Sequence, residues 1–220
     1  MTVAAVVPAA GSGVRMGAGT PKALLPLAGE PLLVHAVRTL RAAPSVGPIV
    51  VAAPGDQVEA VTALLTSYDV VVVPGGAERQ DSVRRALAAL PPEVDLVLVH
   101  DAARALAPTA LVEEVVAALR AGADAVVPVL PVTDTVKRVD GDRVVSTVDR
   151  SHLRSVQTPQ GFRRDLLEEA HAQDYAGATD DAALVERLGR TVHTVPGDLE
   201  AFKVTRPFDL LVAEAVLRDR

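Results

Sequence analysis

Short apolar runs alternate with helical patterns along almost the whole chain. Because these runs are apolar on successive residues, they are typical of strands buried on both faces of a sheet. We expect strands over Ala4–Val7, Ile49–Ala53, Val70–Val73, Leu96–His100, Ala125–Val129 and Thr191–Val195. Between them, apolar residues recur at three- and four-residue spacing and predict helices over Leu32–Leu40, Gln57–Leu65, Ser82–Leu90 and Thr109–Leu119. The alternation predicts an α/β fold with a mostly parallel sheet between layers of helices.

Two further signals follow from this pattern. Pro108 stands near the start of one helix and Pro207 near the start of a last one, where a missing N–H costs nothing. In sheets of this kind, ligands bind beyond the carboxyl ends of the strands. The loops after Val7, Val73, His100 and Val129 are therefore the first places to look for a site.

One segment departs from this alternation of strands and helices. Thr135–Val139 and Arg143–Val148 alternate apolar and polar residues around Asp140-Gly141-Asp142, which predicts a β-hairpin. A two-stranded hairpin is only marginally stable by itself. Two arrangements stay open: the hairpin packs against a second subunit, or it folds back on its own domain.

Composition restricts the class of protein. The 220 residues are 49% hydrophobic, and 22 Lys+Arg against 28 Asp+Glu give a net charge of −6. Such a chain can bury a large core and fits one domain over residues 1–220, or one domain with an excursion. The longest stretches without a charge, Met1–Val14 and Ala42–Gly55, contain Pro and Gly and are too short to span a bilayer. No Lys or Arg precedes the first apolar run, so we expect no secretory signal and a cytoplasmic location.

Several chemistries are disfavoured. The chain has no cysteine, which removes disulfides, thiolate nucleophiles and thiolate-ligated zinc. The five histidines stand far apart without metal-ligand spacing: His35, His100, His152, His171 and His193. Mild acidity and 2% aromatic residues argue against a nucleic-acid surface. We therefore expect no nucleic-acid or membrane partner, and a small anionic ligand bound by a few local cations.

The loop after the first strand is the strongest candidate for that ligand. Residues 8–17 are mostly small, so backbone N–H groups can approach an anion closely, and Arg15 and Lys22 add positive charge. A dinucleotide fingerprint would need Gly where Met16 stands, and no Gly-Lys-Ser/Thr completes a Walker loop. The alternative is a tight turn with two solvated cations. The clustering favours a phosphate site, but it does not identify the nucleotide.

Specific motifs identify a family. Residues 9–16 with Pro21-Lys22 resemble the signature loop of sugar nucleotidyltransferases. Further motifs follow in order: Gly75-Gly76-Ala77-Glu78-Arg79-Gln80-Asp81-Ser82-Val83, His100-Asp101-Ala102-Ala103-Arg104, Asp134-Thr135-Val136-Lys137-Arg138, Gln157-Thr158-Pro159-Gln160, Thr179-Asp180-Asp181 and Lys203-Val204-Thr205. Over nearly the whole chain, this set resembles the 2-C-methyl-D-erythritol 4-phosphate cytidylyltransferase family. The family's usual residues are replaced at Ala23, Ala105 and Ala201, and no replacement removes a charge expected to touch phosphate.

The resemblance implies a fold and a reaction. The fold is a Rossmann-like, mostly parallel sheet flanked by helices, of the nucleotide-diphospho-sugar transferase type. A β-arm at about residues 131–158 is extruded from the single domain and joins two copies into a homodimer. In the reaction, the phosphate of methylerythritol phosphate attacks the α-phosphorus of CTP and releases pyrophosphate, with Mg²⁺ as cofactor. A phosphate monoester is largely ionised near neutral pH, so no side chain has to be activated as a nucleophile.

The resemblance also assigns residues to roles. The catalytic set it implies is Arg15, Lys22, Arg150 and Lys203. CTP binding is implied for Ala9, Ala10, Gly11, Gly13, Gly76, Ser82, Asp101 and Ala102, and Asp101 is also the implied metal ligand. Acceptor binding is implied for Arg104, Thr135, Arg150, Thr158 and Thr179, with the arginine matching Arg150 supplied by the partner subunit.

Simpler interpretations stay open for single positions. Asp101 fits an aspartate capping a turn, Gly76 a plain turn and Ser82 a helix cap, while Lys203 and Arg150 fit exposed surface cations. Two other functions also remain: a cytidylyltransferase for another polyol phosphate, such as ribitol 5-phosphate, or a nucleotide-binding module without catalysis. A nicotinamide-dependent oxidoreductase is disfavoured because Met16 stands where its dinucleotide fingerprint needs Gly.

Overall fold

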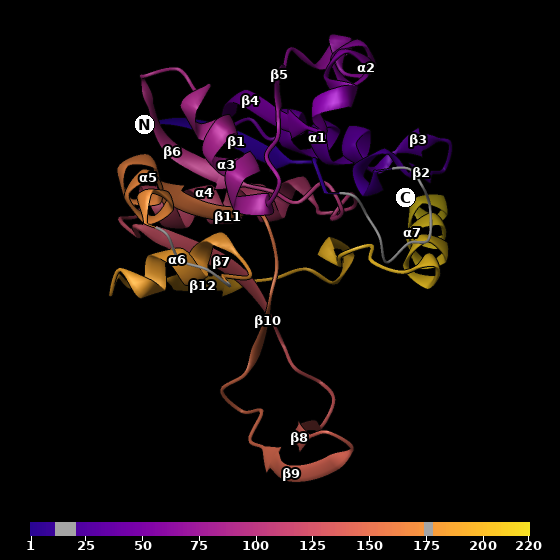
Figure 1. Cartoon of the computed structure of the whole chain (residues 1–220), viewed down its shortest axis with the longest axis vertical. Helices are drawn as coiled ribbons and strands as arrows, with labels where there is room; N and C mark the ends of the chain where they lie inside the picture. Colours follow the sequence, from indigo (N-terminus) through magenta and orange to yellow (C-terminus); the bar gives the residue numbers. More distant parts are fainter. Residues whose placement is uncertain (12–20, 174–177) are drawn as a thin grey trace.

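The structure, a computed structural model, describes residues 1–11, 21–173 and 178–220. Its centre is an eight-stranded sheet in the order β10-β7-β11-β6-β1-β4-β5, with β12 paired to β7 (Figure 1). The strands of this sheet are β1 (Thr2–Pro8), β4 (Val46–Ala53), β5 (Val71–Pro74), β6 (Val94–Val99), β7 (Ala125–Pro131), β10 (Arg154–Val156), β11 (Gln160–Arg163) and β12 (His193–Pro196).

Parallel pairing dominates the half of the sheet that faces the predicted site. β1 pairs in parallel with β4 and β6, and β4 pairs in parallel with β5. The other half is mixed, because β11 runs antiparallel between β6 and β7, and β10 runs antiparallel to β7. The predicted α/β fold with a mostly parallel sheet is confirmed.

Helices cover both faces of this sheet, which explains why the strands are continuously apolar. The helices are α1 (Leu32–Ala42), α2 (Val58–Leu64), α3 (Arg79–Ala88), α4 (Thr109–Arg120), α5 (Arg164–Ala172), α6 (Asp181–Arg187) and α7 (Pro207–Asp219). Along β1, Val3, Ala5 and Val7 pack into one core cluster with α1, α2 and α4. The alternate residues Ala4 and Val6 pack into a second cluster with α3, α5 and α6. Each β1 side chain in these clusters is at most 2% exposed.

Short elements connect this framework. They are the 3₁₀ turns η2 (Lys22–Leu24), η3 (Gly55–Gln57), η4 (Thr66–Tyr68) and η5 (Leu199–Ala201), and the small strands β2 (Pro26–Leu27) and β3 (Glu30–Pro31). A third cluster packs α7 against the segment after β6 through Ala213, Leu106 and Val204. Phe202 also packs against this cluster. The residue between Phe202 and Val204, Lys203, is thereby placed beside the end of β6.

The predicted elements match the structure with shifted bounds. α3 begins at Arg79, three residues before the predicted Ser82, because Glu78 and Asp81 form a capping box at its start. β11 and β10 were not predicted. Gln160-Gly161-Phe162-Arg163 has no strand pattern of its own, and it becomes a strand by pairing with β6 and β7. α5 and α6 were also not predicted.

The predicted hairpin is present as β8 (Val136–Asp140) and β9 (Arg143–Val148), which form a separate two-stranded sheet. Asp140 pairs with Arg143, so the turn contains only Gly141 and Asp142. Figure 1 shows this arm extending away from the rest of the chain, and nearly all of its residues are exposed. Of the two arrangements left open by the sequence, the structure does not show the arm folded back on its own domain. Within the described ranges, no helix is long and apolar enough to cross a membrane.

Candidate active site

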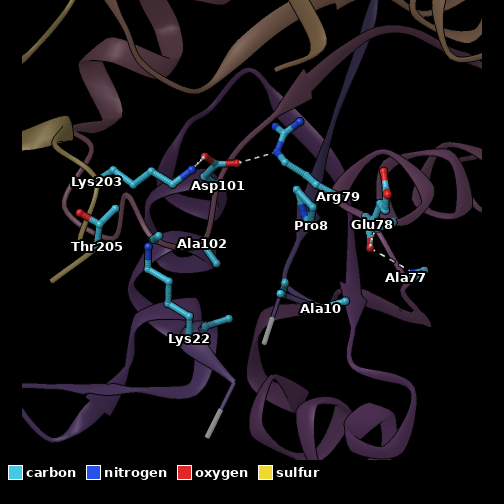
Figure 2. A pocket seen from close by; sticks show the side chains of 16 residues that line it. Pro8, Ala10, Lys22, Ala77, Glu78, Arg79, Asp101, Ala102, Lys203 and Thr205 are labelled. Carbon is cyan, nitrogen blue, oxygen red and sulfur yellow. Dashed lines mark hydrogen bonds and ion pairs between the residues drawn. The ribbon is translucent and has the colours of Figure 1, made fainter. Parts of the chain in front are cut away.

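A cavity of about 460 Å³ opens at the carboxyl ends of β1, β5 and β6. Its walls are formed by Pro8–Gly11 at the end of β1, by Gly76–Arg79 and Ser82 around the start of α3, and by Asp101–Ala103 after β6. Lys22, Ala23, Lys203 and Thr205 complete the lining. In Figure 2, Lys22 and Lys203 lie on one side of this cavity, and Ala10 and Glu78 lie on the other.

Three of the four loops expected from the strand pattern meet here. The exception is the loop after Val129, which does not line the cavity. The expectation was wrong because β7 continues to Pro131 and leads directly into the arm. Its place is taken by η2 and by the segment before α7, which carry the two lysines.

The loop before α3 closely approaches its neighbours. The Gly75 N–H donates to Ala53 O at 2.7 Å, which extends the β4–β5 pairing into the loop. A Cβ on Gly75 would lie 2.4 Å from Ala10 Cβ, and one on Gly76 would lie 2.0 Å from Asp81 Cβ. Only glycine fits at these two positions. Gly75 lets the loop lie directly against the loop after β1, and Gly76 lets it lie against the first turn of α3.

Ser82 organises the same loop from within α3. Its hydroxyl oxygen accepts the Gly76 N–H at 3.1 Å, and the hydroxyl donates to Glu78 O at 3.2 Å. Ser82 is therefore not the helix cap that the simpler interpretation assumed, since Glu78 occupies the N-cap position. Its hydroxyl instead sets the shape of the turn that faces the cavity.

Asp101 is the centre of charge in the cavity. Lys203 Nζ donates to Asp101 Oδ2 at 2.7 Å, and Arg79 Nε donates to Asp101 Oδ1 at 3.2 Å (Figure 2). Burial alone would raise the pKa of the Asp101 carboxyl, but Arg79 and Lys203 outweigh burial and hold this pKa well below its usual range. Asp101 is thus ionised at neutral pH, and it is not merely a turn cap.

Sequence reasoning missed Arg79, although it stands in one of the family motifs. Its Nη1 lies 2.7 Å from Asp181 Oδ2, so one guanidinium joins two carboxylates. Burial alone would lower the pKa of Arg79, but Asp181 and Asp101 outweigh burial and raise it. The sequence did contain a signal for Arg79, since a charged residue in the first turn of a helix that follows a glycine loop is a candidate site residue.

Two residues implied for acceptor binding lie behind the cavity. Thr158 is 4% exposed, and its Oγ1 accepts the Asp101 N–H at 3.0 Å and lies 3.1 Å from His100 Nδ1. Arg104 donates to Ala201 O at 2.7 Å and to Val156 O at 3.0 Å. Thr158 thus braces the strand end that carries Asp101, whereas Arg104 joins the segment after β6 to η5 and β10; neither residue lines the cavity.

The remaining implied residues lie elsewhere or outside the described ranges. Thr135 and Arg150 flank the strands of the arm, and Thr179 precedes α6; all three are exposed, and none lines the cavity of its own chain. Arg15 and Gly13 lie outside the described residues, so the first loop is represented in the cavity by Ala9, Ala10 and Gly11. Ala102 also lines it.

An open α/β sheet with glycine loops and a lysine-lined cavity at its strand ends has the groups that bind the phosphates of a nucleotide. The sequence model of 2-C-methyl-D-erythritol 4-phosphate cytidylyltransferase (IspD) matches residues 3–219. The chain belongs to this family.

Comparisons with individual proteins agree with this family. A cytidylyltransferase of this name from Saccharopolyspora erythraea is 60% identical over 99% of this chain and 100% of its own length. One from Frankia casuarinae is 60% identical over 98% of this chain and 81% of its own length. The crystal structure of the Thermus thermophilus enzyme is similar with a TM-score of 0.82 and 39% identity, and covers 99% of this chain and 100% of that one. The 4-diphosphocytidyl-2C-methyl-D-erythritol synthase of Anaerococcus prevotii gives a TM-score of 0.85 at 30% identity, with 98% of both chains covered.

Proposed function

We propose that this cavity joins CTP to 2-C-methyl-D-erythritol 4-phosphate, giving 4-diphosphocytidyl-2-C-methyl-D-erythritol and pyrophosphate in non-mevalonate isoprenoid synthesis. The observation that carries the proposal is the pair of lysines, Lys22 and Lys203, facing glycine-rich backbone across one cavity in a chain that matches the family over residues 3–219. Lysines supply the charge that phosphates need, and close-packed backbone supplies donors and acceptors for a base edge.

The chemistry requires alignment rather than an activated side chain. An oxygen of the acceptor's phosphate forms a bond to the α-phosphorus of CTP, and the bond from that phosphorus to the bridging oxygen of the β-phosphate breaks. Pyrophosphate leaves with the electron pair. Lys22 and Lys203, together with Arg15 and the partner's Arg150 as proposed catalytic residues, neutralise the negative charge that collects on the phosphates.

Asp101 is the proposed ligand for Mg²⁺. The residues fit this ion only together with substrate: Asp101 is ionised and borders the cavity, whereas the described residues contain no group of three or more possible ligands. Magnesium commonly takes one or two carboxylates and completes its shell with water and substrate phosphates. When bound, it adds positive charge next to the phosphates. Lys203, which donates to Asp101 in the structure, would turn to the CTP phosphates.

The base and the acceptor take opposite sides of the reaction centre. For CTP we propose the backbone of Ala9, Ala10, Gly11, Gly13, Gly76 and Ala102, with Ser82 shaping the turn. For the acceptor we propose Arg104, Thr135, Thr158, Thr179 and the partner subunit's Arg150. Since Thr158 already bonds to Asp101, and Arg104 to Ala201 and Val156, their proposed effect is on the position of the segment that follows β6.

The arm at about residues 131–158 is the proposed dimerisation element of an otherwise single domain. Its valines Val139, Val144 and Val145 are 58–62% exposed, and arms exchanged between two copies would cover them. A homodimer, a cytoplasmic location and the absence of nucleic-acid partners stay predictions from the sequence.

Pyrophosphate release tests the proposed reaction. The purified protein is assayed with Mg²⁺ and each of CTP, UTP, ATP and GTP, first with methylerythritol phosphate and then with ribitol 5-phosphate. We expect CTP and methylerythritol phosphate to be the preferred pair. Equal use of CTP and ATP would contradict the base assignment, preference for ribitol 5-phosphate would contradict the acceptor, and CTP binding without release would indicate a binding module.

A further inference from the structure

A chain of buried charges leads from the cavity into the body of the protein. Arg79 Nε donates to Asp101 Oδ1 at 3.2 Å, and Arg79 Nη1 lies 2.7 Å from Asp181 Oδ2. On the far side, His171 Nε2 lies 2.9 Å from Asp181 Oδ1. The side chains of Asp181 and His171 are 0% and 3% exposed. Asp101 follows β6, and the other three residues belong to α3, α6 and α5, so the chain of contacts joins four elements.

Asp181 does not border the cavity, yet it decides how Arg79 can lie. A guanidinium with only Asp101 as partner could swing on its long side chain toward an incoming phosphate. Contacts at both Nε and Nη1 fix the plane of the group. A buried carboxylate is costly to maintain unless it is paired, so Asp181 depends on Arg79 and His171, and its contact with Arg79 restricts the orientation of the guanidinium.

The first turn of α3 also holds a second segment. Gln80 Nε2 donates to Ala178 O at 3.3 Å, and Arg79, its neighbour in sequence, pairs with Asp181. Residues 178–181, which include Thr179, are therefore attached to α3 at both ends. The same turn begins at the glycine loop that borders the nucleotide side of the cavity.

We propose that Asp181 is a positioning residue for the transfer reaction: through Arg79 it orients Asp101, and together with Gln80 it holds Thr179 at the acceptor side. This inference rests on the proposed function, in which Asp101 serves CTP and Thr179 serves the acceptor. One turn of one helix then sets the distance between the two substrates. An error of about 1 Å in such alignment costs on the order of 100-fold in rate.

Two variants and a matched control test this role. Asp181→Asn keeps the shape of the side chain and removes its charge, while Gln80→Ala removes only the tether to Ala178. Glu113→Gln is the control, because Glu113 is a half-buried carboxylate that accepts hydrogen bonds from Ser45 N at 3.0 Å and Ser45 Oγ at 2.7 Å. It lies in α4, on the opposite face of the sheet.

Steady-state kinetics should separate the two contributions. We expect Asp181→Asn to lower kcat about tenfold or more and to raise the KM for the acceptor. Gln80→Ala should raise the acceptor KM about fivefold and leave the KM for CTP within about twofold of the parent. Glu113→Gln should match the parent in kcat, in the KM for the acceptor and in the KM for CTP. A purely structural role would instead lower the amount of folded enzyme, measured by circular dichroism, without splitting the two KM values.

Each outcome has a definite meaning. Parent-like kinetics in folded Asp181→Asn overturn the proposal. If Asp181→Asn does not fold, Gln80→Ala decides, and an unchanged acceptor KM overturns it. If the parent itself releases no pyrophosphate, the proposed function fails. The inference is then tested separately by amide hydrogen exchange in the presence of CTP and Mg²⁺ alone. CTP should slow amide exchange over residues 178–187 more strongly in the parent than in Gln80→Ala, which loses one of the two contacts with α3; equal slowing in both counts against the coupling.

Discussion

Individual charged residues in this protein act through the partners that the fold gives them. Asp101 and Lys203 are 102 residues apart in sequence and 2.7 Å apart in space. Lys22 reaches the same cavity from a turn that precedes α1. The proposed reaction centre is therefore assembled from three distant parts of the chain, and each cation can be removed without touching a strand.

Replacing Lys22 with alanine should reduce kcat/KM about 100- to 1,000-fold, because one preorganised cation facing the phosphates is lost. The rate of pyrophosphate release measures this effect, and circular dichroism shows whether the fold is intact. Arg120→Ala is the control, since Arg120 is an exposed cation of α4 outside the cavity. Near-normal turnover of folded Lys22→Ala would show that the phosphate site lies elsewhere.

His100 should make folding stability depend on pH. Burial lowers the pKa of His100 to about 4, against an ordinary value of 6.5, while Asp101 opposes the shift. Between these values the unfolded chain binds the extra proton, so this contribution is fully present above about pH 6.5 and is lost as the pH falls toward 4. We expect the free energy of unfolding to drop about 2 kcal/mol between pH 7 and pH 5 from this group.

Urea denaturation of the parent and of His100→Asn at these two pH values measures the contribution. The variant should lose less stability on acidification than the parent does, although it starts from a lower value. His193→Asn, at an exposed position, should behave like the parent. An equal loss in the parent and in His100→Asn would assign the pH dependence to other groups.

At the scale of elements, the glycine loop and the first turn of α3 form one unit. The capping box of Glu78 and Asp81, the Ser82 hydroxyl and the close approach at Gly76 all lie within seven residues of sequence. None of these contacts is strong alone. Together they hold the backbone of the loop, which we propose binds CTP, in one conformation.

A methyl group at Gly76 should disrupt this unit. Its Cβ would lie 2.0 Å from Asp81 Cβ, so the loop or the first turn of α3 has to move. We expect Gly76→Ala to raise the KM for CTP about tenfold and to lower the free energy of unfolding by roughly 1–3 kcal/mol. Gly55→Ala is the control, because a Cβ there meets nothing within 4 Å. Unchanged CTP binding in Gly76→Ala would remove this loop from the base site.

At the scale of the whole molecule, the arm is the feature whose exposed apolar residues a single chain does not cover. It extends into solvent with exposed valines on both strands, and Arg150 follows β9 (Figure 1). A closed two-fold dimer, the commonest soluble assembly, would cover the arm and bring Arg150 to the other subunit's acceptor.

Mixed dimers test whether Arg150 acts across subunits. Lys22→Ala and Arg150→Ala subunits are each expected to be inactive as homodimers. When they are co-expressed, random pairing makes about half of the dimers mixed, and each mixed dimer has one site with both residues intact. About a quarter of parent activity should return. Pairing Lys22→Ala with Arg143→Ala, another arm cation, controls for the arm itself. Verified mixed dimers without activity would exclude action in trans.

The sequence by itself determined the layers and the hairpin, and it predicted the edge of the sheet at which phosphates would bind. Strands such as Thr2–Pro8 are apolar on nearly every residue because both faces are covered, and that requirement is visible locally. The first loop and Lys22 were likewise recognisable, since close backbone approach needs small residues and phosphates need cations.

Only the tertiary structure decided which residues share a contact. Gln160–Arg163 becomes a strand because β6 and β7 offer it hydrogen-bonding partners, not because its own residues favour one. Thr158 bonds to Asp101 at the end of β6, and Arg104 bonds to Ala201 and Val156. Arg79 joins Asp101 to Asp181. Hydrophobic burial is encoded residue by residue, whereas an ion pair depends on the distance between segments that only the folded chain brings together.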